Sequence, residues 1–199
     1  MVLKAIDIFS EKGFKGTTIR EVSRAAGINA PTLYYYFGSK EGLWLEILTY
    51  IQEDLVQELR KATTATDGLM RFRSLLETHI RMSQKNRKVS NIFSIDQEHL
   101  TPEGLKIFKG IHREIVDLYV EELSNLEKLG CIKGRNIKAL AFNTLALISW
   151  QVRWFKPGGQ MSLEDLIIET ISFVLYGILY TRDFRQTKRK VFRGMKGDS

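Results

Sequence analysis

The amino-acid sequence predicts an all-α fold. Apolar residues recur at helical spacing in nearly every segment of the 199-residue chain, and we find no convincing alternation of apolar and polar residues of the kind that marks a strand. Residues that favour helix ends separate these segments. Because 44% of the residues are hydrophobic, the chain can bury a substantial core. We expect nine helices, three short ones followed by six mostly longer ones.

The first two helices are short. The first places three apolar residues on one face, Leu3, Ile6 and Phe9. Gly13 is expected to end it. The second begins at Thr18, which forms a capping box with Glu21, and ends at Gly27, where glycine tolerates a left-handed backbone.

The third and fourth helices follow at once. Asn29 is a favourable N-cap for a third helix that runs to about residue 37. Ser39 then caps a long fourth helix that runs to about residue 61. The polar residues 63–67 separate it from the next helix.

Three further helices occupy the middle of the chain. The fifth carries a mostly apolar face made of Leu69, Phe72, Leu76, His79 and Ile80. Residues 86–88 interrupt it, and a short sixth helix is expected at about 89–96. Thr101 followed by Pro102 marks the start of the seventh, because proline is well tolerated at the first helical position. Its inward residues are Phe108, Ile111, Ile115, Leu118, Leu126 and Leu129, and Gly130 ends it.

The last two helices are expected at about 135–155 and from Ser162 to about residue 183. Residues 157–159, one proline and two glycines, close the first of them. Ser162 with Asp165 three residues later forms the start of the second. This last helix is apolar on more than one face, which predicts burial on two sides.

The net charge of +7 lies mainly at the C-terminal end. Residues 1–46 and 47–181 each carry a net charge of +1, whereas residues 182–199 carry +5. Overall charge is therefore weak support for nucleic-acid binding, and stronger support has to come from the residues of individual helices. We expect residues 184–199 to be a basic tail, for which a solvated extension is the favoured interpretation and a nonspecific DNA contact or a membrane-surface patch are the alternatives.

The second and third helices form a helix-turn-helix, because two short helices are joined by a tight turn that contains glycine. Val22, Ala25, Leu33 and Phe37 face inward. The outer sides of the third helix then carry Ala30, Pro31, Thr32, Tyr34, Tyr35 and Tyr36. The tyrosines could be part of an amphipathic core, but three consecutive helical residues span about 200°, so they cannot all face one core.

These residues suit DNA. The second helix of such a motif lies in the major groove, where the methyl groups of Ala30 and Thr32 can contact thymine methyl groups. Two helix N-termini, at Thr18 and Ser39, offer N–H groups to phosphates. The other candidate phosphate contacts are the tyrosine hydroxyls, Thr17, Thr18 and Lys40.

Residues 5–28, AIDIFSEKGFKGTTIREVSRAAGI, and residues 31–43, PTLYYYFGSKEGL, resemble the TetR family of transcription regulators. The most specific segment is the run from Thr32 to Leu43, in which a tyrosine, an aromatic pair and Ser-Lys-Glu stand at the family's spacing. The resemblance covers about 45 residues, and the expected helices and total length match the family beyond it. Many relatives carry a short basic arm ahead of the first helix, whereas this chain begins at that helix.

The resemblance implies a homodimeric, ligand-responsive repressor that binds a palindromic operator. It implies a DNA-binding domain at 1–46 and a ligand-binding and dimerisation domain at 47–183. It places DNA-backbone contacts at Thr18, Tyr34, Tyr36 and Lys40, and groove contacts at Ala30, Pro31, Thr32 and Tyr35. Ala30 departs from the polar or basic residue of many relatives, so shape readout or thymine contacts are expected to carry more of the specificity.

The resemblance also implies an effector pocket among the fourth to eighth helices and a dimer interface on the last two. Plausible pocket residues are Phe72, Leu76, His79, Phe93, Phe108, Ile111, His112, Asn143, Leu147, Trp150 and Trp154. Each of them could instead be a core or interface residue, and for His79 and His112 a satisfied core histidine is the favoured interpretation. The apolar residues expected at the interface are Ile167, Ile171, Val174, Leu175 and Ile178.

Other functional classes find little support. The sequence has no phosphate-binding glycine loop and no paired histidines at metal-ligand spacing, so we expect no cofactor, no metal and no catalysis. The single cysteine, Cys131, excludes a disulfide scaffold and fits a cytoplasmic protein, and no signal peptide or membrane span is evident. Two alternatives stay open, a ligand sensor that does not bind DNA and, less favoured, a small helical enzyme.

Overall fold

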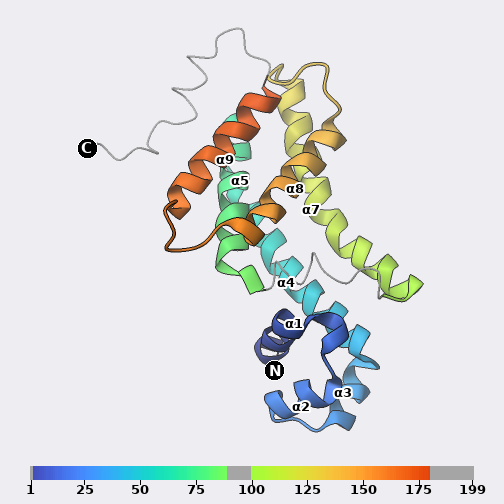
Figure 1. Cartoon of the computed structure of the whole chain (residues 1–199). Coiled ribbons are helices and arrows are strands. Elements are labelled where there is room, and N and C mark those ends of the chain that lie inside the picture. Colours follow the sequence, from blue (N-terminus) through green and yellow to red (C-terminus); the bar gives the residue numbers. More distant parts are fainter. Residues whose placement is uncertain (1, 89–99, 180–199) are drawn as a thin grey trace. The chain divides into compact units, whose positions relative to one another are not determined.

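The computed structural model describes residues 2–88 and 100–179, and these residues form eight α-helices and no strand (Figure 1). The predicted all-α class is therefore confirmed. The short sixth helix expected at 89–96 lies outside the described residues. The helices are α1 (Val2–Gly16), α2 (Ile19–Ala26), α3 (Ala30–Phe37), α4 (Lys40–Ala62), α5 (Gly68–Lys85), α7 (Pro102–Lys128), α8 (Ile137–Trp154) and α9 (Leu163–Ile178).

Three helix ends differ from those predicted. The backbone breaks at Gly13, with φ of 70°, but one more turn follows and α1 ends at Gly16. Asn136 caps α8 by accepting a hydrogen bond from the Ala139 N–H at 2.9 Å. The last helix ends at Ile178 rather than near residue 183, because Leu179 already has extended backbone angles.

The chain divides into two compact units. The first comprises Met1–Val56 with Ser83–Glu114, and the second comprises Gln57–Met82 with Ile115–Ser199. Helices α4, α5 and α7 each contribute residues to both units. The domain border expected after residue 46 lies inside α4 and inside the first unit.

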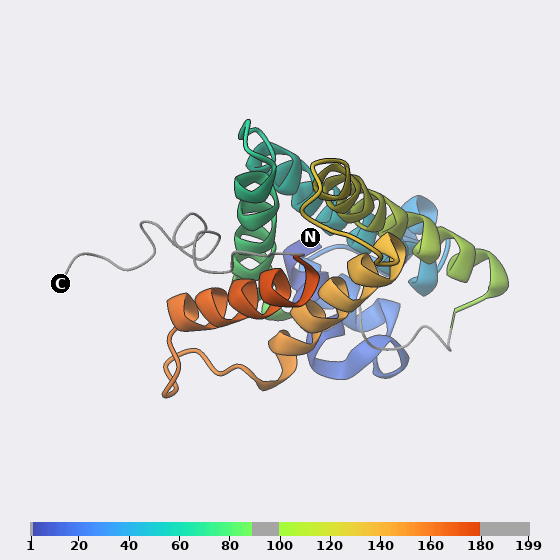
Figure 2. The same cartoon turned by 90° about the horizontal axis from the view of Figure 1, so that it is seen from above.

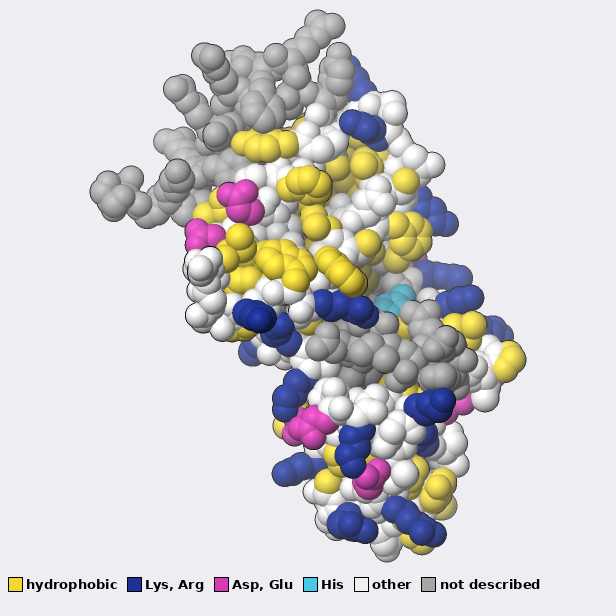
Figure 3. Space-filling view, viewed as in Figure 1, with side chains coloured by type: hydrophobic (Ala, Val, Ile, Leu, Met, Phe, Trp, Pro, Cys, Tyr) yellow, Lys and Arg dark blue, Asp and Glu magenta, His cyan; other side chains and the backbone are white. Residues whose placement is uncertain are grey.

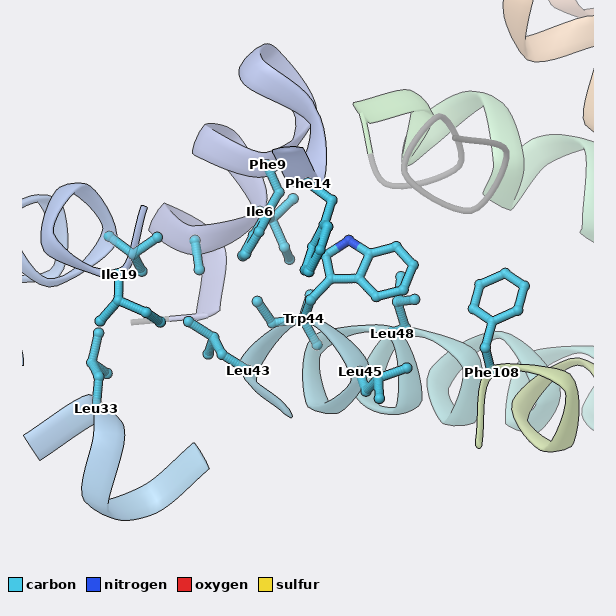
Figure 4. Close-up of a cluster of buried hydrophobic side chains, with 13 residues drawn as sticks. Ile6, Phe9, Phe14, Ile19, Leu33, Leu43, Trp44, Leu45, Leu48 and Phe108 are labelled. Carbon is cyan, nitrogen blue, oxygen red and sulfur yellow. The ribbon is translucent and has the colours of Figure 1, made fainter. Parts of the chain in front are cut away.

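The first unit is built around Trp44 of α4. Its indole meets the ring of Phe14 edge-on at 5.5 Å between centroids and stacks on the ring of Phe108 from α7 at 5.8 Å. Figure 4 shows these three rings in a buried cluster that also includes side chains of α1, α2 and α3. The other labelled members of this core are Ile6, Phe9, Ile19, Leu33, Leu43, Leu45 and Leu48.

The second unit packs residues of α5 and α7 with α8 and α9. Helices α8 and α9 lie side by side (Figure 2), and the buried amide of Gln151 donates to the hydroxyl of Thr170 at 2.6 Å between them. Arg81 of α5 donates to both carboxylate oxygens of Glu164 at 2.7 Å and so ties the first turn of α9 to α5. No helix that the structure describes is long and apolar enough to cross a membrane.

Candidate nucleic-acid interface

Capping residues fix both ends of α2 and the start of α3. The Thr18 hydroxyl accepts from the Glu21 N–H, and the Glu21 carboxylate accepts from the Thr18 N–H, which completes the predicted capping box. Gly27 adopts φ of 69°, a left-handed conformation that glycine allows without strain. Asn29 then accepts from the Thr32 N–H at 2.8 Å and starts α3. The local sequence therefore determines the geometry of the helix-turn-helix.

The face of α3 that points away from the core is aromatic. Leu33 anchors the helix, since only 1% of its surface is exposed. Tyr34, Tyr35 and Tyr36 are 52%, 84% and 71% exposed. Tyrosine exposed to this degree leaves its ring and its hydroxyl available to another molecule. The outward placement expected for the three tyrosines therefore agrees with the structure, and their contacts with DNA stay a prediction.

Thr17 is placed differently from the expectation. It is only 1% exposed, and its hydroxyl donates to the Gly13 carbonyl at 2.7 Å. A phosphate cannot reach a side chain that is covered and already donating. We therefore remove Thr17 from the candidate interface and assign it to the connection between α1 and α2.

The hydroxyls of Thr18 and Thr32 also donate within the chain. The Thr18 hydroxyl donates to Glu21 at 2.8 Å, and the Thr32 hydroxyl donates to Asn29 at 2.5 Å. Phosphate oxygens are acceptors, so neither hydroxyl can donate to one while its capping bond persists. The hydroxyls of the exposed tyrosines of α3 remain the better side-chain donors.

Lys40 is tied to α1. Its Nζ donates to the Phe14 carbonyl at 2.7 Å and lies 4.3 Å from the centre of the Phe14 ring. An ammonium group carries three N–H bonds, so this contact leaves others for a phosphate. Ser39 accepts from the Gly42 N–H at 2.9 Å and caps α4 as predicted. Lys40 thus holds α1 and α4 together in addition to carrying charge.

Several exposed basic side chains near this surface were absent from the predicted set. Lys15, Arg20 and Arg24 are exposed on α1 and α2. The first helix of the motif crosses the DNA backbone, which was the available signal for Arg20 and Arg24. Lys12 bonds Glu21 at 2.6 Å, and together with the Thr18 bonds it lowers the pKa of that carboxyl to about 2. Glu21 therefore stays ionised, with its charge partly offset by Lys12.

A second surface lies on α8 and α9. Hydrophobic side chains gather on this face in Figure 3. The exposed large apolar residues of the two helices are Phe142, Trp150, Trp154, Phe173 and Tyr176. In contrast, all the residues expected at the dimer interface are buried within the subunit, with 0–6% exposed surface: Ile167, Ile171, Val174, Leu175 and Ile178. They face the core of the same subunit and are not accessible to a partner.

The residues expected in an effector pocket fall into separate groups. Phe72, Leu76 and His79 are buried in the second unit, and Phe108, Ile111 and His112 belong to the first. The expected pocket residues on α8 are exposed or partly exposed: Asn143, Leu147, Trp150 and Trp154. Phe93 lies outside the described residues. Because these groups belong to different units, the pocket as a whole stays a prediction.

His79 belongs to a buried polar pair. Its Nδ1 lies 2.9 Å from the Tyr119 hydroxyl, and both side chains are buried, which matches the satisfied core histidine favoured above. Burial lowers the pKa of His79 to about 4, so its ring is neutral near pH 7. Tyr119, which no sequence pattern singled out, also meets the ring of Phe72 edge-on at 6.2 Å.

Three buried N–H groups of the first unit have no acceptor among the described residues. They are the indole Nε1 of Trp44 and the amide Nε2 atoms of Gln52 and Gln84. Leaving a buried donor unpaired is unfavourable, typically by about 1–3 kcal/mol. Across residues 2–88 and 100–179 we find no cluster of three side chains suited to hold a metal ion.

The chain is similar to known regulators along most of its length. The family model described as "Bacterial regulatory proteins, tetR family" matches residues 3–47, and the model described as "Tetracyclin repressor-like, C-terminal domain" matches residues 65–178. The HTH-type transcriptional repressor KstR2 of Rhodococcus jostii is 28% identical over 177 residues, which cover 87% of each chain.

Solved structures share the fold. KstR2 of Mycobacterium tuberculosis, described as a ketosteroid transcriptional regulator, matches with a TM-score of 0.76 and 21% identity, covering 90% of this chain and 93% of that one. AibR in complex with isovaleryl coenzyme A and operator DNA matches with a TM-score of 0.78 and 22% identity, covering 86% of this chain and 94% of that one. Since the C-terminal family model alone spans more than half of the sequence, the chain belongs to the TetR family of bacterial transcription regulators.

Proposed function

We propose that this regulator is a homodimeric repressor that binds a palindromic operator through α3 and releases it when a small molecule binds. The observation that carries the proposal is the exposed row Tyr34, Tyr35 and Tyr36 on a helix whose other face is anchored by Leu33. A group of neighbouring exposed aromatic residues commonly marks a recognition surface. Residues 1–46 form the proposed DNA-binding domain, and residues 47–183 the proposed ligand-binding and dimerisation domain.

Dimerisation is proposed through the exposed side of α8 and α9. Phe142, Trp150 and Trp154 lie at helical spacing on α8, and Phe173 and Tyr176 lie on neighbouring turns of α9. Aromatic residues of this kind supply much of the binding energy at protein interfaces. A two-fold axis brings the same surface of both subunits together, and two α3 helices can then read half-sites about 34–36 Å apart.

The proposed effector carries oxygen acceptors. Gln52 and Gln84 of the proposed ligand-binding domain present buried N–H groups that need an acceptor, and a carbonyl or carboxylate oxygen would supply one. KstR2 is described as a ketosteroid transcriptional regulator, and AibR is described in complex with isovaleryl coenzyme A. Ketosteroids and isovaleryl coenzyme A both contain carbonyl groups. These two compounds are therefore the first effectors to test.

Selection from a random duplex pool tests DNA binding. Full-length protein is incubated with the pool, bound duplexes are amplified and sequenced, and affinity is measured by fluorescence anisotropy. We expect an inverted repeat whose half-sites are separated by one helical turn. Recovery of no enriched sequence, together with ligand binding, would instead support the alternative of a sensor that does not bind DNA.

Release by an effector is tested on the selected operator. Isovaleryl coenzyme A and a 3-ketosteroid are titrated separately into the protein–operator complex, with coenzyme A alone as a control. The expected result is a fall in operator affinity of about fivefold to 150-fold, the usual range of allosteric coupling. An effector that binds the protein and leaves operator affinity unchanged would contradict ligand control by that compound.

A further inference from the structure

The residue that caps α7, Thr101, is itself bonded by a residue of α4. The Glu41 carboxylate accepts from the Thr101 N–H at 3.1 Å and from the Thr101 hydroxyl at 2.8 Å. The Thr101 hydroxyl oxygen in turn accepts from the Gly104 N–H at 3.0 Å. Three groups at the start of α7 are therefore connected to one carboxylate of α4, and all of these residues belong to the first unit.

Gly104 makes this close approach possible. A side-chain carbon at position 104 would overlap the Glu41 Oε1 atom and would lie 2.7 Å from Glu41 Cδ. Any larger residue would push the carboxylate out of its position. Gly110 on the same helix has open space around the corresponding position, with nothing within 4 Å. The requirement for glycine is thus specific to the turn that faces Glu41.

The next turns of the same two helices are joined by the aromatic rings. Trp44 lies three residues after Glu41 and stacks on Phe108 at 5.8 Å, and both side chains are almost fully buried (Figure 4). The contact between α4 and α7 therefore has a polar end at Glu41 and a pair of packed aromatic rings in the turn that follows. Helix α7 continues to Lys128, so its later residues belong to the second unit.

We propose that Glu41, Thr101 and Gly104 form a latch that positions the DNA-binding helices and links operator binding to α7. The inference rests on the proposed function. With the latch closed, the first turn of α4 is held in place, and this turn begins with Lys40, directly after the Ser39 cap. Holding this turn in position before binding lowers the entropy lost on binding DNA. Operator binding must, by reciprocity, stabilise the latch.

Two variants open the latch from the α7 side and leave Glu41 unchanged. Gly104→Ala displaces the carboxylate, although alanine favours helix more than glycine does. Thr101→Val removes the hydroxyl and keeps the shape of the side chain. Gly110→Ala is the matched control, because it makes the same substitution on the same helix without a clash. Thr101→Ser keeps the hydroxyl and is expected to behave like the wild type.

Operator affinity is measured by anisotropy on the selected duplex, and thermal unfolding is followed in parallel. Gly104→Ala and Thr101→Val are each expected to weaken operator binding about threefold to tenfold. Because both substitutions open the same latch, the double variant is expected to bind the operator as tightly as the weaker-binding of the two single variants. Gly104→Ala should not lower the unfolding temperature. Weaker binding without lost stability distinguishes a positioning role from a merely structural one.

Hydrogen exchange supplies a second readout. In the wild type and in Gly110→Ala, operator DNA is expected to slow exchange of the Thr101 and Gly104 amides, whereas Gly104→Ala should lose this response. The latch is overturned if wild type and Gly104→Ala bind the operator equally, or if the operator leaves these amides unchanged in the wild type. A wild-type chain that binds no duplex would overturn the proposed function as well.

Discussion

The ammonium group of Lys40 donates to the carbonyl oxygen of Phe14 at 2.7 Å, across 26 residues of sequence. The first residue of α4 is thereby connected to the kinked end of α1. The same ammonium lies over the Phe14 ring, and that ring packs against Trp44. One side chain thus carries charge toward the proposed DNA surface and helps to hold the domain that presents it.

Lys40→Ala is expected to weaken binding to operator and non-operator DNA by a similar factor. Its charge contributes to phosphate contacts, which carry no sequence information, so the slope of log affinity against log salt should fall by about 1. Loss of the bond to Phe14 should also lower the free energy of unfolding by about 1 kcal/mol. Anisotropy titrations at several salt concentrations and urea unfolding measure the two effects. A change confined to the operator would contradict the phosphate role.

Tyr35→Ala is expected to alter which operator is chosen. Tyr35 is the most exposed of the three tyrosines and sits on the proposed recognition helix, so its loss should reduce operator affinity about fivefold or more and change the sequences recovered by selection. Tyr50→Ala is the matched control, since Tyr50 is an exposed tyrosine of α4 that has no proposed role. Equal effects of the two substitutions would remove α3 from the recognition surface.

Phe173→Asp is expected to convert the dimer into monomers. Phe173 is exposed on the apolar face of α9, and burying an unpaired carboxylate against a second subunit is strongly unfavourable. Analytical ultracentrifugation at micromolar concentration measures the change, and operator affinity should fall with it. Ile107→Asp on α7 serves as the control, because Ile107 is also exposed but lies in the first unit. A variant at position 173 that remains dimeric would place the interface elsewhere.

Stability is expected to depend on pH through His79. The folded state lowers the pKa of His79 from 6.5 to about 4, because burial disfavours the charged ring. Between these values the unfolded chain binds more protons, so the free energy of unfolding falls as pH decreases, by at most about 1.4 kcal/mol per pH unit. Above about pH 6.5 the His79 ring is neutral in both the folded and the unfolded state, so this residue no longer makes the free energy of unfolding depend on pH.

Urea unfolding between pH 7 and pH 5.5 measures this slope and avoids most carboxyl titration. His79→Gln keeps a hydrogen-bonding partner for Tyr119 and should flatten the dependence. His112→Asn should flatten it less, since burial also lowers the pKa of His112 but that side chain is only partly covered. An unchanged slope in His79→Gln would show that the histidine does not titrate as inferred.

Local chemistry made much of the geometry of the helix-turn-helix predictable. The capping box at Thr18, the left-handed Gly27 and the N-cap Asn29 depend on neighbouring residues only, so the sequence specified the helix-turn-helix and the outward row of tyrosines. The helix that begins at Thr101 and Pro102 was predictable for the same reason. Capping and helical periodicity act over a few residues, and a single sequence displays them directly.

The roles of individual side chains depended on tertiary contacts. Thr17 is buried against Gly13, and Lys40 bonds Phe14, although neither contact follows from residue type. The apolar character of α9 indicated burial on two sides, but it did not show that Ile171 faces the core and Phe173 faces outward.

The sequence by itself therefore determined the all-α class, most helix ends and the exposed tyrosines of the proposed DNA surface, because these follow from short-range propensities and spacing. Only the tertiary structure decided which face of α9 is free and which residue of α4 bonds the Thr101 cap of α7. Glu41 and Thr101 lie 60 residues apart, and their contact exists because the packing of Trp44 on Phe108 brings two helix starts together. Long-range packing selects such partners among many compatible ones, and no local pattern encodes that choice.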